Sequence, residues 1–254
     1  MPYHPSQQLH FLFGRRPFQG APPQPPRGGG WGGAGCAPPD GGPSNIFVGE
    51  DANFAPDIEG DAIWGNVVEY LLDGRAFWAN HGVHHPFLLG GYGGEGLQYH
   101  NHFSHIFNHV DGNPHGAEQP LPAHVRDGIT FAEILPRPTI GNGNIANGAM
   151  LAEAMGMGHI EWLAGLIFDP TWAKRRTVFL SKGAADALRN ALGQLDLGIY
   201  LPEDGLNAGE GRFIGVFPGN AFRCRLAIHY HFAARLPAGG LQEIKTTIRR
   251  LLLD

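Results

Sequence analysis

The chain has 254 residues, of which 43% are hydrophobic and only 16% are charged. Its formal net charge of -5 gives no general attraction to nucleic acid or anionic membranes, which disfavours a wholly basic binder of polyanions. Two cysteines, Cys36 and Cys224, allow at most one disulfide and no four-thiolate zinc site. No stretch is apolar enough for a signal peptide or a membrane span, so we expect a soluble protein that does not act at a membrane.

Residues 1–43 are distinguished by ten glycines and ten prolines. Such a segment has too little apolar surface to offset the entropy lost on ordering its backbone. We therefore expect a flexible Gly/Pro-rich arm. The alternative is a segment that docks on a protein partner through four aromatic residues, Phe11, Phe13, Phe18 and Trp31.

Residues 44–124 form an acidic, histidine-rich region, with ten acidic residues and a single base, Arg75. Apolar residues at helical spacing predict a helix over 61–78, capped by Asp57 or Asp61 and ended or bent at Gly74. The same spacing predicts a second helix over 101–110.

Residues 125–254 are expected to be a mixed C-terminal region, either a separate domain or one domain with 44–124. We expect two helices, or one bent at Gly156 and Gly158, then a buried strand at 176–180, a helix at 184–195 and a short strand at 198–202. Strands at 212–217 and 222–232 are joined by a PGNA turn, and 241–253 reads as a helix. The fold class is therefore α+β, with helices and short antiparallel strands.

Histidine is the chemically informative residue, because nine of the 14 fall between His81 and His124. His102, His105 and His109 share one face of the predicted helix. Three imidazoles with an open fourth position are typical of a catalytic metal site, and Glu95 or Asp111 could complete or orient it. The alternative is a polar, solvated helix face.

The run HHPFLLGGYGGEGLQ at 84–98, with the histidines that follow, resembles the His-Me finger or HNH nucleases, especially those of bacterial polymorphic toxins. The resemblance covers residues 81–111. It implies His85 as the general base with His84 beside it, and Asn101 as the middle polar residue. His105 and His109 would hold a divalent ion such as zinc, magnesium or manganese, which would stabilise phosphoryl charge during cleavage of nucleic acid.

The run FRCRLAIHYHF at 222–232 predicts a strand with a polar face of Arg223, Arg225, His229 and His231. With Lys174, Arg175 and Arg176, this face could hold an anionic substrate, or its histidines could be metal ligands. The alternative is an amphipathic strand with a solvated face. Cys224 falls on the apolar face, which indicates inert packing.

Three functions follow as hypotheses. The first is a metal-dependent hydrolase, most concretely a nuclease with the residues named above. The second is a non-haem metalloenzyme of the oxygenase type, with iron held by His100, His102 and His229 or His231. The third is an assembly protein whose arm contacts partners and whose surface histidines titrate near neutral pH.

Overall fold

The structure is a computed structural model. It describes residues 3–14, 45–94, 96–108, 120–140, 148–168, 176–218 and 224–254. Within these ranges the centre is a five-stranded sheet in the order β2-β1-β3-β5-β4. The strands are β1 (Asn45–Gly49), β2 (Ile129–Glu133), β3 (Arg176–Ser181), β4 (Ile214–Phe217) and β5 (Cys224–His229). Neighbouring strands are parallel except β4, which pairs antiparallel with β5.

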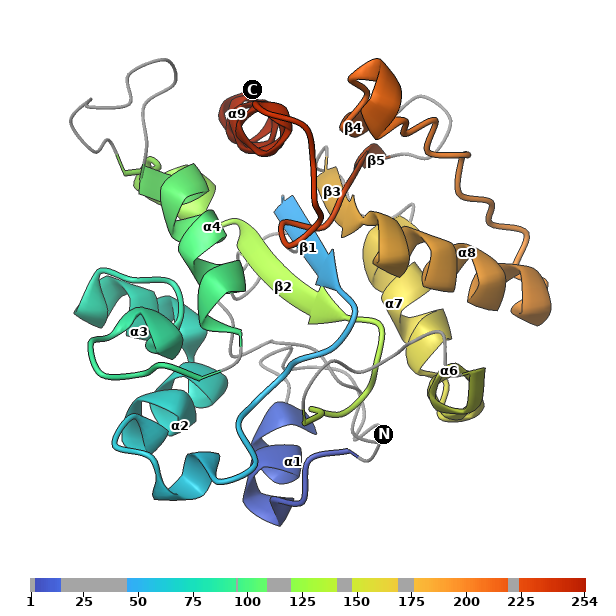
Figure 1. The fold of residues 1–254 in the computed structure, drawn as a ribbon. Helices are drawn as coiled ribbons and strands as arrows, with labels where there is room; N and C mark the ends of the chain where they lie inside the picture. Colours follow the sequence, from blue (N-terminus) through green and yellow to red (C-terminus); the bar gives the residue numbers. More distant parts are fainter. Residues whose placement is uncertain are drawn as a thin grey trace.

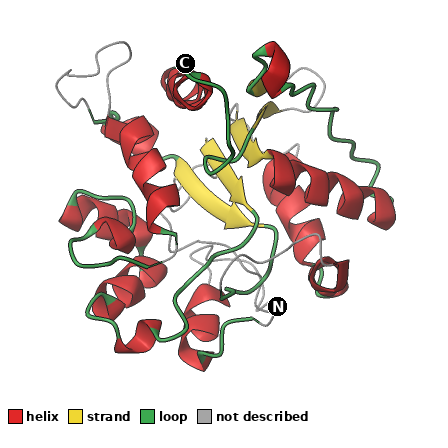
Figure 2. Cartoon of the chain, in the orientation of Figure 1, coloured by secondary structure: helices red, strands yellow, loops and turns green. Residues whose placement is uncertain are grey.

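Helices cover both faces of this sheet (Figure 1, Figure 2). One face carries α4 (Leu97–Asn108) and α9 (Gly240–Leu253), and the other carries α6 (Gly148–Gly156), α7 (His159–Phe168) and α8 (Lys182–Leu195). Smaller helices complete the described chain: α1 (Gln7–Gly14), α2 (Trp64–Leu72), α3 (Gly74–His81) and α5 (Ala123–Arg126), with short 3-10 helices at Ile58–Gly60, Pro86–Leu88 and Ala208–Glu210.

The α+β class is confirmed, but the expected antiparallel pairing holds only for the hairpin of β4 and β5. The other three pairings are parallel. Parallel strands need helical crossovers, which place helices on both faces and bury the strands on both sides. This explains why the first four residues of β1 and of β2 are all buried.

Alternate residues of the strands supply two apolar cores. Val48, Val178 and Leu226 face α6, α7 and α8, and all three are fully or almost fully buried. Phe47, Phe131 and Phe179 face α4 and α9. The Phe47 ring stacks on Phe179 with 4.5 Å between centroids and on Phe131 with 5.4 Å. The apolar row on this second face ends just before the polar residues at the carboxyl ends of the strands.

The first part of the predicted flexible arm is folded, which corrects the sequence analysis for residues 3–14. Leu9 and Phe13 of α1 are 0% and 2% exposed, because apolar residues recur at helical spacing even in this short segment. His4 Nε2 lies 2.9 Å from the Ala55 carbonyl oxygen. Phe11 is 65% exposed, whereas the rest of the arm, with Phe18 and Trp31, lies outside the described residues.

The expected helix over 61–78 is two helices, α2 and α3, that meet at Asp73 and Gly74. The predicted cap by Asp57 or Asp61 is wrong, because α2 begins at Trp64 with Ile63 as its N-cap and has no side-chain capping hydrogen bond. Asp61 Oδ1 accepts a hydrogen bond from the Ile63 N–H (3.0 Å) in the turn before the helix. The short strand expected at 198–202 is instead a loop. This loop continues past Gly215 of β4, where the Asp204 carbonyl lies so close that a side chain would collide with it.

The two regions on either side of residue 124 share one sheet. β1 comes from the acidic region, yet it pairs with β2 on one side and β3 on the other, both from the C-terminal region. A strand in the centre of a sheet cannot be removed without breaking both neighbouring ladders. Both regions therefore contribute neighbouring strands to a single sheet.

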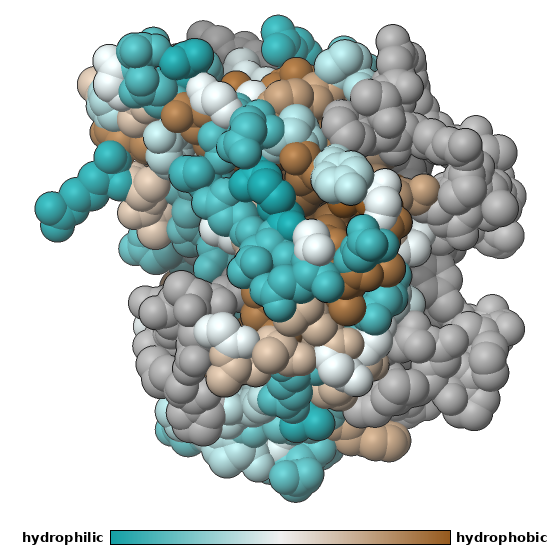
Figure 3. Space-filling view, turned by 90° about the vertical axis from the view of Figure 1, so that its right-hand side faces the viewer, coloured by the Kyte–Doolittle hydropathy of each residue, from teal (hydrophilic) through white to brown (hydrophobic). Residues whose placement is uncertain are grey.

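Figure 3 shows the side of the molecule to the right of Figure 1, where hydrophilic residues cover much of the surface and hydrophobic ones show between them. Large apolar side chains that are exposed in the described residues are scattered in the sequence: Phe11, Leu72, Tyr200, Val216 and Leu253. Among the described helices, none is long and apolar enough to cross a membrane.

Candidate active site

The topology of the sheet marks one place as a binding site. The chain goes from β1 to β2 on one side, then to β3 on the other side of β1. In open sheets of this kind, ligands bind outside the carboxyl ends of the strands where the order reverses. Here that place lies beyond the carboxyl ends of β1 and β3, at Gly49 and Ser181.

Four residues form a row across the carboxyl ends of the parallel strands. Gly49 pairs with Glu133, and Ser181 pairs with His229. Because side chains alternate along a strand, these residues lie on the same face as Phe47, Phe131 and Phe179, two positions further along. The row therefore lies on the α4 side of the sheet.

Glu133 leans across β1 into the space that Gly49 leaves open. A methyl group on Gly49 would collide with the Glu133 carboxylate, and first with its Oε2 atom. That Oε2 is buried and has no hydrogen-bond partner among the described residues. A buried polar atom without a partner costs free energy, so its retention points to a role in binding or chemistry.

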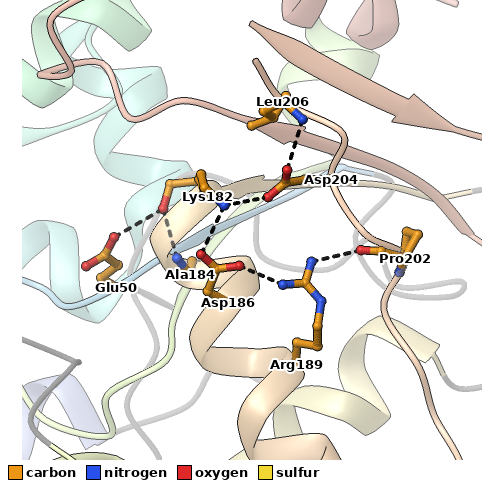
Figure 4. A network of polar contacts seen from close by, with 9 residues as sticks. Glu50, Lys182, Ala184, Asp186, Arg189, Pro202, Asp204 and Leu206 are labelled. Carbon is orange, nitrogen blue, oxygen red and sulfur yellow. Dashed lines mark hydrogen bonds and ion pairs between the residues drawn. The ribbon is translucent and has the colours of Figure 1, made fainter. Parts of the chain in front are cut away.

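Glu50 follows β1 directly and lies beside the first turn of α8 (Figure 4). Ser181 Oγ donates to Glu50 Oε1 at 3.4 Å and accepts from the Ala184 N–H at 3.1 Å, which caps the helix. A methyl group on Gly183 would collide with the Glu50 carboxylate. The positive end of the α8 dipole favours the ionised form of this group.

Asp51 completes a carboxylate cluster, which consists of Glu50, Asp51 and Glu133. Its Oδ2 accepts a hydrogen bond from the Thr139 hydroxyl. Thr139 is buried, and its N–H donates to the Ala52 carbonyl oxygen at 2.9 Å, which ties the chain after β2 to the chain after β1. Three acidic side chains from two adjacent strand ends are thereby brought together.

Burial and the mutual repulsion of these carboxylates raise the pKa values of Glu133 and Glu50. Burial raises the pKa of Glu133 well above its usual value, and the charges of Asp51 and Glu50 raise that pKa further. Burial also raises the pKa of Glu50, with smaller contributions from Asp51 and Asp186, while the Ser181 hydrogen bond lowers it. The pKa values of both groups are thus raised, that of Glu133 more strongly, and acid–base enzymes with paired carboxylates also hold their two groups in different environments.

Three histidines form a second group, the histidine cluster of His84, His85 and His100. The rings of His85 and His100 stack with 3.5 Å between centroids, and His84 Nε2 lies 3.3 Å from His100 Nδ1. His84 and His85 are 2% and 4% exposed. Burial lowers the pKa of His100 to about 3 and holds those of the other two well below 6.5, so the cluster is neutral at pH 7.

The catalytic histidines predicted from the nuclease resemblance therefore lie inside the protein. His85 Nδ1 accepts from the Phe87 N–H at 3.3 Å, where it caps a short helix, and its ring packs edge-on against Tyr70. His84 stacks on Phe131. Asn101 is exposed on α4. Their catalytic roles stay a prediction, although the local packing of both histidines is that of core residues.

Two of the four predicted metal ligands, His102 and His105, lie in the described part of the chain. His105 is exposed on α4 and His102 is partly buried beside it, whereas His109 and Asp111 lie outside the described residues. Within the described ranges, no three His, Cys, Asp or Glu side chains are placed to hold a metal ion. The divalent metal, or iron in the oxygenase hypothesis, remains a prediction.

The polar face predicted for the last strand is partly covered by α9. Arg225 donates to Thr177 Oγ1 (3.1 Å) and to the Leu251 carbonyl oxygen (2.7 Å), because α9 covers this side of the sheet. These bonds fasten the end of α9 and favour a structural role over substrate binding. Arg223, Lys174 and Arg175 lie outside the described residues, as does the side chain of Arg176.

His229 and His231 differ from each other in exposure. His229 is 4% exposed, its Nδ1–H donates to the Tyr230 carbonyl oxygen at 2.8 Å, and burial lowers its pKa to about 4. His231 is exposed and stacks on Tyr99 of α4 at 5.6 Å between centroids. Cys224 is buried in the apolar core, as its position on the strand predicted.

Sequence reasoning missed all three members of the carboxylate cluster. A signal was present, because NIFVG at 45–49 is followed at once by Glu50 and Asp51, and ITFA at 129–132 by Glu133. An acidic residue directly after a buried parallel strand lies at the functional edge of the sheet. Recognising this required knowing that both segments are parallel neighbours.

Comparison of the chain with models of known protein families, with curated proteins and with solved structures finds no match.

Proposed function

We propose that this protein is an enzyme that breaks a glycosidic bond by hydrolysis or transfer, using the carboxylate cluster as its acid and base. The observation that carries the proposal is Glu133, whose buried Oε2 has no partner in the described residues and whose pKa is held well above that of an ordinary carboxyl group. A protonated acid beside ionised carboxylates is the arrangement that glycoside cleavage uses.

The charge of the site supports this reaction class over phosphoryl transfer. Among the described residues, no Lys or Arg lowers the pKa of Glu133, and Lys182 next to Ser181 is paired with Asp186 at 3.2 Å and Asp204 at 2.8 Å. Clustered carboxylates stabilise the positive charge that develops on an oxocarbenium-like sugar. They repel a phosphodiester, which needs cations around it.

Each carboxyl group has a distinct role in this reaction. Glu133 gives its proton to the departing oxygen or nitrogen as that bond to the sugar carbon breaks. Glu50, held by Ser181 at 3.4 Å and by the α8 terminus, is the ionised carboxylate that either attacks the sugar carbon or takes a proton from the attacking water. Asp51 adds negative charge near the cationic carbon.

The test is a panel of aryl glycosides, nucleosides and nucleotides, in which release of the aryl alcohol or the base is followed in the presence of EDTA. We expect one class to be cleaved, with Glu50→Gln slowing turnover about 10²-fold. Glu203→Gln is the matched control, because Glu203 is exposed in a loop. No cleavage of any member, or an unchanged rate for Glu50→Gln, contradicts the proposal.

The nuclease hypothesis makes a different prediction in the same assay. It requires cleavage of DNA or RNA that depends on added zinc, magnesium or manganese and is lost in His105→Ala. The long acidic stretch speaks against it, since no Lys or Arg lies between Ala76 and His124. Metal-dependent release of oligonucleotides, with no sugar release in EDTA, would favour the nuclease over the carboxylate enzyme.

Two glycines provide a sharper test of the carboxylate positions. Gly49→Ala and Gly183→Ala would push away the carboxylates of Glu133 and Glu50 respectively. Because each Glu side chain can rotate aside, we expect a small change in stability but a 10- to 100-fold lower kcat, roughly the loss that a misplacement of about 1 Å causes. Initial rates and thermal unfolding measure the two effects.

The control for these variants is Gly193→Ala in α8. Gly193 is exposed, and a methyl group there meets no neighbouring atom within 4 Å. This change should leave the rate alone and raise stability by about 0.5–1 kcal/mol, the usual gain for alanine over glycine in a helix. Full activity in Gly49→Ala and Gly183→Ala would mean that the two carboxylates are not the reacting groups.

A further inference from the structure

The first turn of α4 lies over the row that contains Gly49 and Glu133. Phe103 of α4 packs edge-on against Phe47, with 4.9 Å between ring centroids, and against Phe131, with 5.2 Å. Tyr99 precedes Phe103 by four residues, which is one helical turn or about 6 Å along the axis.

Along β1 and β2, the distance from the phenylalanines to the row is similar to one turn of α4. Gly49 and Glu133 each lie two residues beyond the phenylalanines that contact Phe103, which is about 6.6 Å along a strand. The direction is set by Gly96, which precedes α4: a methyl group there would lie 3.5 Å from the carbonyl oxygen of Asn53, four residues past β1. The α4 helix therefore begins at the carboxyl edge, and Tyr99 lies at the level of the row.

The Tyr99 ring is held in place by aromatic neighbours. It stacks nearly parallel on His231, at 5.6 Å and 8°, and contacts Phe103 edge-on at 4.9 Å. Phe232 packs beside it with 5.9 Å between centroids. The ring is thus held by aromatic contacts that do not involve the hydroxyl.

We propose that Tyr99 is a further catalytic residue of this site, whose hydroxyl donates a hydrogen bond to a sugar hydroxyl next to the reacting carbon. This inference rests on the proposed function, because it places the sugar beside the carboxylate cluster. A hydrogen bond of this kind strengthens as the sugar distorts toward the transition state.

The electrostatics of the site suit this role. Burial raises the pKa of Tyr99 well above 10, and the charges of Glu133, Glu50 and Asp51 raise that pKa further. The phenol therefore remains a hydrogen-bond donor over the whole working pH range.

The experiment compares Tyr99→Phe with wild type on the glycoside that the panel identifies. Phenylalanine keeps the ring contacts and removes only the hydroxyl, so the melting temperature should not change. We expect kcat to fall 10- to 100-fold with KM changed less than threefold, since the bond is strongest in the transition state. Tyr230→Phe, which packs against the same apolar cluster as Tyr99, is the matched control.

The outcomes separate the two proposals. A fall in kcat for Tyr99→Phe alone supports the role of the hydroxyl. An unchanged kcat in an active enzyme overturns the role of Tyr99 and leaves the carboxylate mechanism standing, because the ring would then serve packing only. A wild-type protein that cleaves no glycoside overturns the proposed function and this inference together.

Discussion

Glu133→Gln is expected to lower glycosidic bond cleavage about 10³-fold and to make the folded protein more stable at neutral pH. Glutamine has nearly the same shape as a protonated glutamic acid, but it has no proton to give to the leaving group. Initial rates on the best substrate of the panel measure the first effect. Equal rates for the variant and wild type would show that Glu133 is not the acid.

The stability effect follows from the sign of the pKa shift. Because the pKa of Glu133 is raised in the folded state, the unfolded chain loses this proton first, near its ordinary pKa of about 4.5. As pH rises above that value, the unfolded state binds fewer protons than the native state, so the free energy of unfolding falls. Glutamine removes this loss.

The advantage of Glu133→Gln in melting temperature should therefore be small at pH 4 and larger at pH 8. Glu153→Gln is a suitable control, because this glutamate is 39% exposed and pairs with Arg137 at 3.4 Å. A stability difference that does not change with pH would contradict the buried, protonated state of Glu133. If Glu133→Gln is more stable than wild type but inactive, Glu133 serves the reaction and lowers the stability of the folded protein.

Acidification from pH 7.5 to pH 5 is expected to destabilise the protein through its buried histidines. Burial holds the pKa of His84 well below 6.5 in the folded state and lowers that of His229 to about 4. Below pH 6.5 the unfolded chain takes up protons that the native state does not bind. The free energy of unfolding therefore falls as the pH falls, and His229 contributes about 2 kcal/mol of this loss at pH 5.

Urea unfolding of His84→Phe at both pH values tests this account. Phenylalanine suits the aromatic surroundings of Phe107 and Phe131, and it cannot be protonated. The variant should lose less stability than wild type between pH 7.5 and pH 5. His124→Asn is the control, since His124 is exposed. An identical acid loss in His84→Phe and wild type would mean that His84 accepts a proton in the native state.

Local elements were predictable from spacing alone. The break between α2 and α3 at Gly74, the helices around Gly156 and Gly158, the hairpin of β4 and β5 and the terminal helix α9 all occur as expected. Each depends on contacts between residues close in sequence, such as helical apolar faces or a turn. The α1 segment was missed because the composition of residues 1–43, dominated by Gly and Pro, hid three apolar residues at helical spacing: Leu9, Leu12 and Phe13.

The sequence by itself determined the α+β class, most helices and which strand residues are apolar. Only the tertiary structure decided which strands are neighbours. Phe47, Phe131 and Phe179 lie far apart in the chain, yet parallel pairing stacks them and so brings Glu50, Asp51 and Glu133 to one edge.

The many histidines in the sequence, in contrast, led to the prediction that His84 and His85 are catalytic. The fold buries both among aromatic rings, where burial keeps them neutral. The physical reason is that strand order and direction depend on which faces the helices cover, a global property of packing that residue spacing does not contain.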